Sequence, residues 1–363
     1  MKVKFLLHGM SLLGYDAINL GEKDLQYGRE FLEQLRDEYN LPFVSTNVYL
    51  TGTKKLFARP YIIKNYGNLK VGIFGITDNT NVEKIIFNTG FTITDPIQAA
   101  KTAVEYLRRN VDVVVALSHL GIHGARELAR KVPGIDIIIS GHNRTVMYEP
   151  EQIGSTWIMQ PGYQGKYLGE MEVVMVDKKI DRVKGKLVAL NKKIPDDPEL
   201  AKLVKDFDQA LIEMFPMEKA KADRKFSKIS EVNCLRCHMR QHKQWRSTLH
   251  YVAWKTLVDK KQNHNPECQQ CHTTRFGEPT GFKSVYETPD LVNVQCAQCH
   301  REKSGDITEH YRRMAMRRIG HKQSNGQIES DFEPVTEKIC LKCHNEDNSP
   351  NFNYEEYLAK VTH

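Results

Sequence analysis

The cysteines of this chain are confined to one region and follow one spacing. All eight lie between residues 234 and 343, and residues 1–233 contain none. They form four Cys-x-x-Cys-His motifs, which are Cys234–His238, Cys268–His272, Cys296–His300 and Cys340–His344. So uneven a distribution assigns the cysteines to one module with one purpose.

The spacing of each motif is typical of covalent haem attachment. Two thiols one short turn apart can reach the two vinyl groups of a porphyrin, and the adjacent imidazole can then bind its iron. Zinc ribbons and redox disulfides need the paired cysteines but not the histidine that follows them. The sequence therefore predicts four haem c groups. The predicted attachment residues are Cys234, Cys237, Cys268, Cys271, Cys296, Cys299, Cys340 and Cys343, and the predicted proximal iron ligands are His238, His272, His300 and His344.

Haem attachment of this kind takes place outside the cytoplasm, so the motifs predict a periplasmic or extracellular protein. Residues 1–10 are a poor secretory signal, because His8 and Gly9 interrupt a short apolar stretch. We therefore expect a missing or misassigned start of the sequence. No run approaches the roughly 18 apolar residues that cross a bilayer, and no transmembrane segment is expected.

The module that carries the motifs has little apolar surface to bury. Residues 226–363 contain few aliphatic runs and many charges, so they would struggle to form a core unaided. Four porphyrins would supply that core, which predicts a mainly α, haem-cored domain with aromatic residues such as Trp245 and Phe282 packed against the porphyrins. The formal charge of the chain is +7, but haem propionates would offset it, so we expect no nucleic-acid partner.

Residues from about 231 to 363 resemble the tetrahaem cytochrome family that accepts electrons from hydroxylamine oxidoreductase. Besides the motifs, the resemblance is carried by Trp245–His250, Phe276–Gly277, Gly281–Phe282, Leu291–Gln295 and Phe352. It implies His250, His310 and His363 as the distal ligands of the third, first and fourth haems. The second haem has no distal protein ligand in the family's best-known member. His264, His321, His242 or a neighbouring subunit could supply one here, and each of these three histidines could equally be an ordinary surface residue.

The first half of the chain alternates strand-like and helix-like segments. Three short apolar runs, at residues 70–76, 111–117 and 135–139, indicate strands buried on both faces of a sheet. Helix-like segments at residues 96–109 and 123–132 separate them, and later strands are expected within residues 157–162, 167–176 and 183–190. This alternation predicts an α/β layered domain.

Polar clusters follow two of these strands, at Ser118–Gly121 and Ser140–Arg144. Loops at the carboxyl ends of strands are where such sheets hold ligands. Together with Gly14–Leu25, the clusters resemble the metallophosphatase domain of the periplasmic 5′-nucleotidase family over residues 5–190. In that family the corresponding motifs build a two-metal site that clamps phosphate and activates water.

The chain departs from this family pattern at several positions. The first two motifs are missing, Glu22 and Lys23 stand where the family has Asn and His, and Arg144 stands where it has a metal ligand. Only His119 and His142 remain at matching positions. We therefore expect a degenerate site at Glu22, Lys23, His119, His142 and Arg144, with no bound metal and with phosphatase activity lost. Lys23 and Arg144 could still form an anion pocket.

The predicted organisation is a degenerate metallophosphatase domain at residues 1–192, a helical linker at 193–225 and a tetrahaem cytochrome domain at 226–363. The predicted function is electron transfer through four haems to redox partner proteins, without enzyme activity. Three alternatives stay open. They are a subunit of a polymeric cytochrome filament, which would be a homo-oligomer, a small-molecule redox enzyme with an open haem iron, and a nucleotidase linked to redox state.

Overall fold

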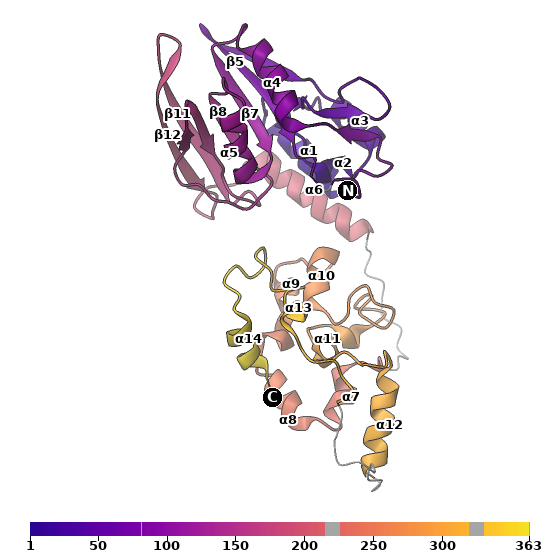
Figure 1. Ribbon diagram of the computed structural model, residues 1–363. Helices are drawn as coiled ribbons and strands as arrows, with labels where there is room; N and C mark the ends of the chain where they lie inside the picture. Colours follow the sequence, from indigo (N-terminus) through magenta and orange to yellow (C-terminus); the bar gives the residue numbers. More distant parts are fainter. Residues whose placement is uncertain (81, 215–225, 319–329, 363) are drawn as a thin grey trace. The chain divides into compact units, whose positions relative to one another are not determined.

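The structure is a computed structural model of the chain and describes residues 1–80, 82–214, 226–318 and 330–362. The chain forms two compact units, Met1–Lys205 and Asp206–His363 (Figure 1). Each unit is described below by itself. Residues 215–225 of the predicted linker lie outside the described residues. So do His363, which was predicted as a distal haem ligand, and His321, which was named as a possible one.

The first unit is built on a six-stranded sheet with the strand order β4-β5-β7-β8-β10-β9. Its four middle strands are parallel, and β4 and β9 pair with them in the antiparallel direction at the two edges. The strands are β4 (Tyr61–Tyr66), β5 (Leu69–Thr77), β7 (Val113–His119), β8 (Ile137–Ser140), β9 (Glu151–Ile153) and β10 (Thr156–Met159). The middle strands are rich in Val and Ile and are largely buried, as expected of parallel strands covered on both faces.

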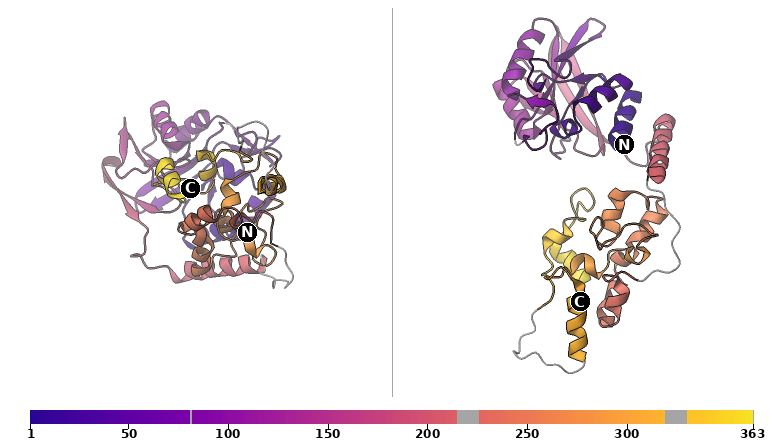
Figure 2. Two further views of the ribbon diagram at one scale, coloured as in Figure 1. Left: turned by 90° about the horizontal axis from the view of Figure 1, so that it is seen from below. Right: turned by 90° about the vertical axis from the view of Figure 1, so that its right-hand side faces the viewer.

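Two helices cover one face of this sheet. They are α4 (Pro96–Leu107) and α5 (Gly121–Lys131), which Figures 1 and 2 show running alongside the strands. Helix α4 begins where the Asp95 side chain accepts a hydrogen bond from the Gln98 backbone N–H, at 2.8 Å, with proline as its first residue. The core between helices and sheet is fully apolar and includes Phe74, Ile76, Leu107, Val114, Ala116, Ile122, Leu128, Ile138 and Ile158.

The opposite face is covered by the amino-terminal part of the chain, which forms a second apolar core. Its elements are α1 (Lys2–Leu12), β1 (Ile18–Asn19), α2 (Glu22–Leu25), α3 (Arg29–Glu38), β2 (Phe43–Val44), β3 (Val48–Leu50) and β6 (Phe91–Ile93). Strand β1 packs directly on β5, and a side chain at Gly75 would clash with Asn19 Oδ1 and the Val44 carbonyl. Glycine is therefore required where these two layers meet.

The remaining elements of the first unit are a hairpin and a helix. Strands β11 (Tyr167–Val176) and β12 (Lys179–Ala189) pair in the antiparallel direction. Helix α6 (Pro198–Met214) follows them, and the boundary between the two units falls within it, after Lys205. The turn of the hairpin falls at Asp177 and Lys178, whose backbones have positive φ. The α/β layered fold predicted for the first domain is confirmed, with strands and helices close to the predicted ranges.

The second unit is mainly helical and has a small core. Its elements are α7 (Glu231–Leu235), α8 (Met239–Trp245), η1 (Leu249–Val252), α9 (Ala253–Asp259), α10 (Pro266–His272), η2 (Pro289–Leu291), α11 (Cys296–Cys299), α12 (Ile307–Arg318), α13 (Glu337–Cys340) and α14 (Tyr354–Val361). The core consists of Ile229, Phe282, Leu291, Ala297 and Ile307, flanked by partly buried aromatic side chains. The prediction of helices in this region is confirmed. A core formed by haem groups stays a prediction.

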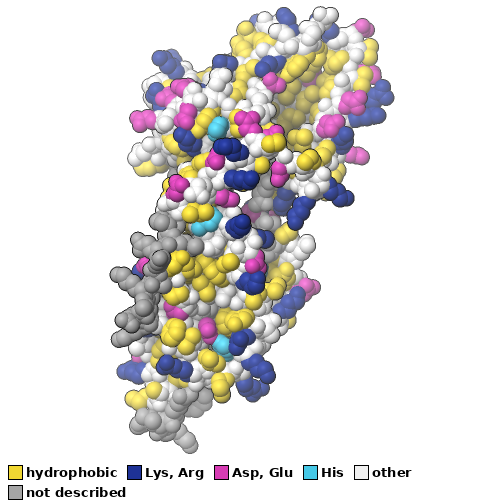
Figure 3. Space-filling model, turned by 180° about the vertical axis from the view of Figure 1, so that it is seen from behind, with side chains coloured by type: hydrophobic (Ala, Val, Ile, Leu, Met, Phe, Trp, Pro, Cys, Tyr) yellow, Lys and Arg dark blue, Asp and Glu magenta, His cyan; other side chains and the backbone are white. Residues whose placement is uncertain are grey.

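One face of the molecule carries both signs of charge close together. Figure 3 shows Lys and Arg side chains interspersed with Asp and Glu over the face in view, without a large patch of one sign. Within the described residues, no helix is both long and apolar enough to cross a membrane.

Leu128 tests the core between α5 and the sheet, because its side chain is fully buried there. We expect Leu128→Ala to lower the free energy of unfolding of the first unit by about 2–5 kcal/mol, through lost burial and the cavity left behind. Urea unfolding of the full chain, followed by tryptophan fluorescence and circular dichroism, measures this change. Leu6→Ala, at a leucine that is 59% exposed, is the control and should change it by less than about 0.5 kcal/mol. An equal effect of the two substitutions would contradict the described core.

Candidate functional site

Three polar side chains of the first unit converge at the carboxyl edge of the sheet. His119 is the last residue of β7, and His142 lies in the loop that follows β8. Because β7 and β8 are parallel neighbours, both loops emerge at the same edge. Glu22, the first residue of α2, reaches them from the layer that covers the opposite face of the sheet.

The ligand atoms of this triad, Glu22, His119 and His142, lie close enough to hold one metal ion. Glu22 Oε2 is 2.9 Å from His119 Nε2 and 3.5 Å from His142 Nδ1. The two imidazole rings meet edge to face, with centroids 4.8 Å apart. One ligand atom from each residue lies within 4.8 Å of the other two. Two imidazoles and one carboxylate form the ligand set of many catalytic zinc and iron sites.

Burial makes the triad more than a surface cluster. Glu22 is only 5% exposed, and its Oε2 accepts no hydrogen bond of good geometry from the described residues. A buried carboxylate is costly unless a cation or hydrogen-bond donor compensates it. Burial lowers the pKa of His119, while the negative charge of Glu22 opposes that shift. A neutral imidazole is the form that binds metal, so the triad fits one divalent ion.

The backbone at the triad is specialised. His142 has a positive φ of 82°, which is uncommon for a residue with a side chain and often marks a functional position. Gly21 donates its backbone N–H to Asp24 Oδ2 at 2.7 Å, which holds the start of α2. A Cβ atom on Gly21 would lie 2.8 Å from His119 Nε2. The absence of a side chain at Gly21 thus lets the loop approach the imidazole.

The other two residues of the predicted degenerate site lie outside the triad. Lys23 is exposed on α2. Arg144 lies two residues after His142, with its guanidinium carbon 5.3 Å from the centre of the Tyr163 ring. Sequence reasoning missed Tyr163, although it follows strand β10 at the same edge of the sheet and could have been found by the rule that identified the other loops.

The cysteine motifs of the second unit adopt the local geometry that their spacing predicts. In three of them, the histidine backbone N–H bonds to the carbonyl of the first cysteine, at 2.8–2.9 Å, closing one helical turn. The exceptional motif, Cys268–His272, lies wholly within helix α10. No cysteine forms a disulfide, and among the described residues no cysteine belongs to a group of three potential metal ligands.

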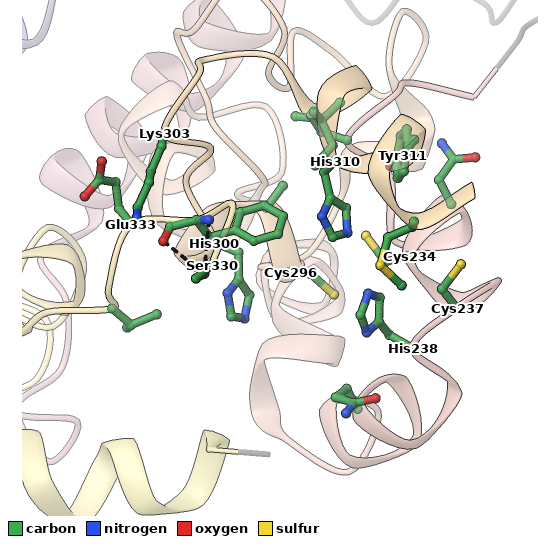
Figure 4. A pocket seen from close by; sticks show the side chains of 18 of the residues that line it. Cys234, Cys237, His238, Cys296, His300, Lys303, His310, Tyr311, Ser330 and Glu333 are labelled. Carbon is green, nitrogen blue, oxygen red and sulfur yellow. Dashed lines mark hydrogen bonds between the residues drawn. The ribbon is translucent and has the colours of Figure 1, made fainter. Parts of the chain in front are cut away.

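The first motif lines a largely apolar cavity of about 550 Å³, shown in Figure 4. Cys234, Cys237 and His238 of the first motif line this cavity. His300, from the third motif, and His310, from helix α12, line it as well. The rings of His238 and His310 lie nearly parallel, with centroids 6.0 Å apart.

Hydrogen bonds fix the orientation of His310 in this cavity. Its Nδ1 is 2.9 Å from Asp331 Oδ2, and Asp331 also pairs with Arg313, at 2.6 Å. With Nδ1 donating to the carboxylate, the other ring nitrogen is left available.

The remaining predicted histidines occupy different surroundings. His250 lies beside His344, with ring centroids 6.0 Å apart, and burial lowers the pKa of both imidazoles. His272 Nδ1 lies 2.7 Å from the Ala253 carbonyl. His242 is buried and pairs with Glu231. His264 is buried, and its Nε2 has no hydrogen-bond partner in the described part of the chain. These placements leave the assignment of distal ligands a prediction.

Thiols of different motifs also meet. Cys234 lies within hydrogen-bonding reach of Cys296, and Cys271 lies within reach of Cys343. The hydrogen bond from Cys343 lowers the pKa of Cys271 to about 7, whereas burial raises that of Cys299 to about 11. The cysteines thus differ in expected reactivity as free thiols.

Comparison with solved structures defines the fold class of the first unit as a calcineurin-like metallophosphatase fold. The YfkN phosphoesterase of Bacillus subtilis aligns with a TM-score of 0.51 and 24% identity, over 58% of this chain and 74% of that one. The sulfate thiohydrolase SoxB of Thermus thermophilus aligns with a TM-score of 0.55 and 22% identity, over 60% and 41%.

Sequence relatives narrow the class to 5′-nucleotidase-like domains. The bovine 5′-nucleotidase is 30% identical over 218 residues, which cover 53% of this chain and 38% of the relative. Protein UshA of Yersinia enterocolitica is 25% identical over 252 residues, which cover 55% and 46%. The chain thus spans less than half the length of these relatives. In the second unit, the family model described as cytochrome c554 and c-prime matches residues 233–301, which include the first three cysteine motifs.

These comparisons correct the function predicted from the cysteine motifs. The relatives are named as 5′-nucleotidases, which points to a phosphoesterase and not to electron transfer, whether by a carrier, a filament or a redox enzyme. The prediction that the protein is not an enzyme is wrong for the same reason. Redox partners lose their support together with that function.

The cofactor prediction is also corrected. The short match to the cytochrome model does not support four haem c groups, and the first unit holds a three-ligand group where no metal was expected. The physical reason lies in Glu22. Its substitution for Asn was interpreted as one sign of a degenerate site, but a carboxylate oxygen is itself a good ligand for divalent cations.

Gly21 allows a test of the triad that leaves all three ligands in place. We expect Gly21→Ala to displace the His119 ring, because the new methyl group would lie 2.8 Å from Nε2, and to weaken metal binding about 10–100-fold, as changes in the support of a ligand do. Titration of the metal-free protein with Zn²⁺ in a calorimeter measures the affinity. Gly154→Ala, at a turn glycine with open space around it, controls for general destabilisation. Unchanged affinity in Gly21→Ala would refute the arrangement.

Proposed function

We propose that the first unit is a metal-dependent phosphoesterase domain that binds one divalent ion at Glu22, His119 and His142 and hydrolyses a phosphate ester. The observation that carries the proposal is the buried Glu22 carboxylate, which lies between two imidazoles and lacks a hydrogen bond to Oε2. A bound cation would compensate that charge. The similarity to 5′-nucleotidases supports the choice of a phosphate ester as substrate.

The chemistry follows from the ligand set. A divalent ion, when bound, polarises a phosphoryl oxygen and lowers the pKa of coordinated water. Three protein ligands are the number found in catalytic zinc sites, which keep a further position for water or substrate. In this chain the partly exposed imidazoles of His119 and His142, at 30% and 36%, face solvent, whereas Glu22 anchors them from beneath. The site is thus open to a substrate from the loop side.

Substitution of Glu22 tests this function. We expect Glu22→Gln to weaken Mn²⁺ or Zn²⁺ binding at least about tenfold, because a charged ligand is lost, and to reduce metal-dependent phosphate release from p-nitrophenyl phosphate and AMP in proportion. Calorimetry and a phosphate-release assay measure the two effects. Glu30→Gln, on the exposed surface of α3, is the matched control. Wild-type protein that neither binds metal nor releases phosphate would refute the proposal.

We propose that the cysteine motifs of the second unit form a second kind of site. The sequence predicts that they attach a prosthetic group covalently. In this proposal the paired thiols bond a prosthetic group covalently and the following histidine ligates its metal, with the cavity beside Cys234, His238 and His310 as the best-formed position. The size and apolar lining of that cavity support it. Attachment of this kind implies the periplasmic or extracellular location predicted above. No electron-transfer function is attached to the proposal.

Thiol reactivity tests the attachment. If the first motif is bonded through thioethers, Cys234 and Cys237 will resist iodoacetamide even after reduction and full denaturation, and peptide masses will show an added group at this motif. Protein made without covalent maturation machinery serves as the control and should be alkylated at both residues. Complete alkylation of material from a host with that machinery would exclude the proposal.

A further inference from the structure

A buried arginine lies against the third cysteine motif of the second unit. The side chains of Arg275 and Glu302 are only 7% and 4% exposed, and they form an ion pair at 2.7 Å. Removing two charges from water is costly, and a buried pair seldom adds net stability. The backbone of Arg275 also has a positive φ of 54°, which is a strained conformation for a residue with a side chain. Both features indicate that this arginine has a role beyond stability.

Arg275 binds the backbone and one side chain of the third motif. Its Nε donates to the Ala297 carbonyl at 2.8 Å, and its Nη2 donates to the His300 carbonyl at 3.2 Å. The backbone N–H of Arg275 donates to Gln298 Oε1 at 2.7 Å. One residue thus holds the motif at three points. These three contacts and the ion pair with Glu302 are called the Arg275 clamp here.

The third motif needs such support because its helix is short. Helix α11 has four residues and closes a single turn, in which the His300 N–H donates to the Cys296 carbonyl at 2.9 Å. A helix of this length is not stable by itself. Cys296 and His300 also line the apolar cavity of about 550 Å³. The Arg275 clamp therefore fixes part of the wall of that cavity.

A tight turn places Arg275 beside the motif. The Glu278 N–H donates to the Arg275 carbonyl at 3.1 Å, and a Cβ atom on Gly281 would lie 1.6 Å from that carbonyl oxygen. Glycine is thus required where the turn closes. Glu278 also forms an ion pair with Arg301, at 2.6 Å, which is more exposed than the first pair. This second pair joins two side chains, so Arg301 is a matched comparison for Arg275.

We propose that Arg275 is a positioning residue for covalent attachment at the third motif. It holds Cys296, Cys299 and His300 in one geometry before the prosthetic group binds. In the attachment step, each thiol adds across a carbon–carbon double bond of the group. Sulfur bonds to one carbon and the thiol hydrogen goes to the other, so no oxidant is needed. This role rests on the proposed attachment at the cysteine motifs and adds the residue that prepares the third of them.

Variants of the full chain, made in a host with covalent maturation machinery, test this role. Peptide masses after reduction and full denaturation give the fraction of the third motif that carries the added group, relative to the fourth motif. We expect Arg275→Met to lower this ratio at least about twofold, because the third motif is no longer held in one geometry. In protein made without that machinery, iodoacetamide should modify Cys299 at least about tenfold faster in the native state, since hydrogen bonds to a charged group are lost. Arg301→Met is the matched control and should change neither quantity.

The outcomes separate this proposal from the proposed attachment. A wild-type ratio in Arg275→Met would overturn the proposal, and so would an equal loss of the group at all four motifs, which is the result of a merely structural role. Wild-type protein with no added group at any motif would refute the attachment itself. In that case, faster modification of Cys299 in Arg275→Met would still support the clamp, and an unchanged rate would overturn it.

A second variant covers the case in which Arg275→Met does not fold, as measured by circular dichroism. Arg275→Lys keeps a positive charge beside Glu302, but an ammonium group cannot reach both motif carbonyls as the guanidinium fork does. We expect it to fold and to show the same lowered ratio. A wild-type ratio in Arg275→Lys would overturn the proposal.

Discussion

The first unit depends on a carboxylate that the fold buries between two imidazoles. Glu22 lies under His119 and His142, and its Oε2 lacks a compensating hydrogen bond. A buried charge of this kind is maintained only when something else neutralises it. A divalent ion fits the distances and the ligand types, and the remaining features of the site, from Gly21 to the positive φ of His142, serve to bring the three ligands together.

The parallel sheet explains why residues far apart in the sequence share one site. Strands β7, β8 and β10 end at the same edge of the sheet, and a loop with polar side chains follows each of them. These loops supply His119 and His142 of the triad, whereas the layer on the opposite face supplies Glu22. A carboxylate oxygen can itself ligate a divalent ion, so Glu22 in place of Asn is weak evidence that the site has lost its metal.

In the second unit, by contrast, the candidate site residues are close together in the sequence. Its motifs are local, and one helical turn suffices to place two thiols and an imidazole on the same side. The structure adds long-range pairings that no spacing reveals, such as His238 with His310, His250 with His344 and the thiol of Cys234 with that of Cys296. The core of this unit is small and rich in aromatic side chains, and residues of the first and third motifs line a large, mainly apolar cavity.

The sequence by itself determined the local features of this protein. Short, nearly continuous runs rich in Val and Ile predicted the buried strands, because such runs are typical of strands covered on both faces of a sheet, and the Cys-x-x-Cys-His spacing predicted two thiols one short turn apart. Sequence reasoning also named Glu22, His119, His142 and Arg144, but it interpreted Glu22 as an altered ligand of a degenerate site. Only the tertiary structure showed that its carboxylate is buried against both imidazoles and that Tyr163 lies against Arg144. Burial and distances between loops depend on how the layers pack, and a linear pattern of residue types does not contain that information.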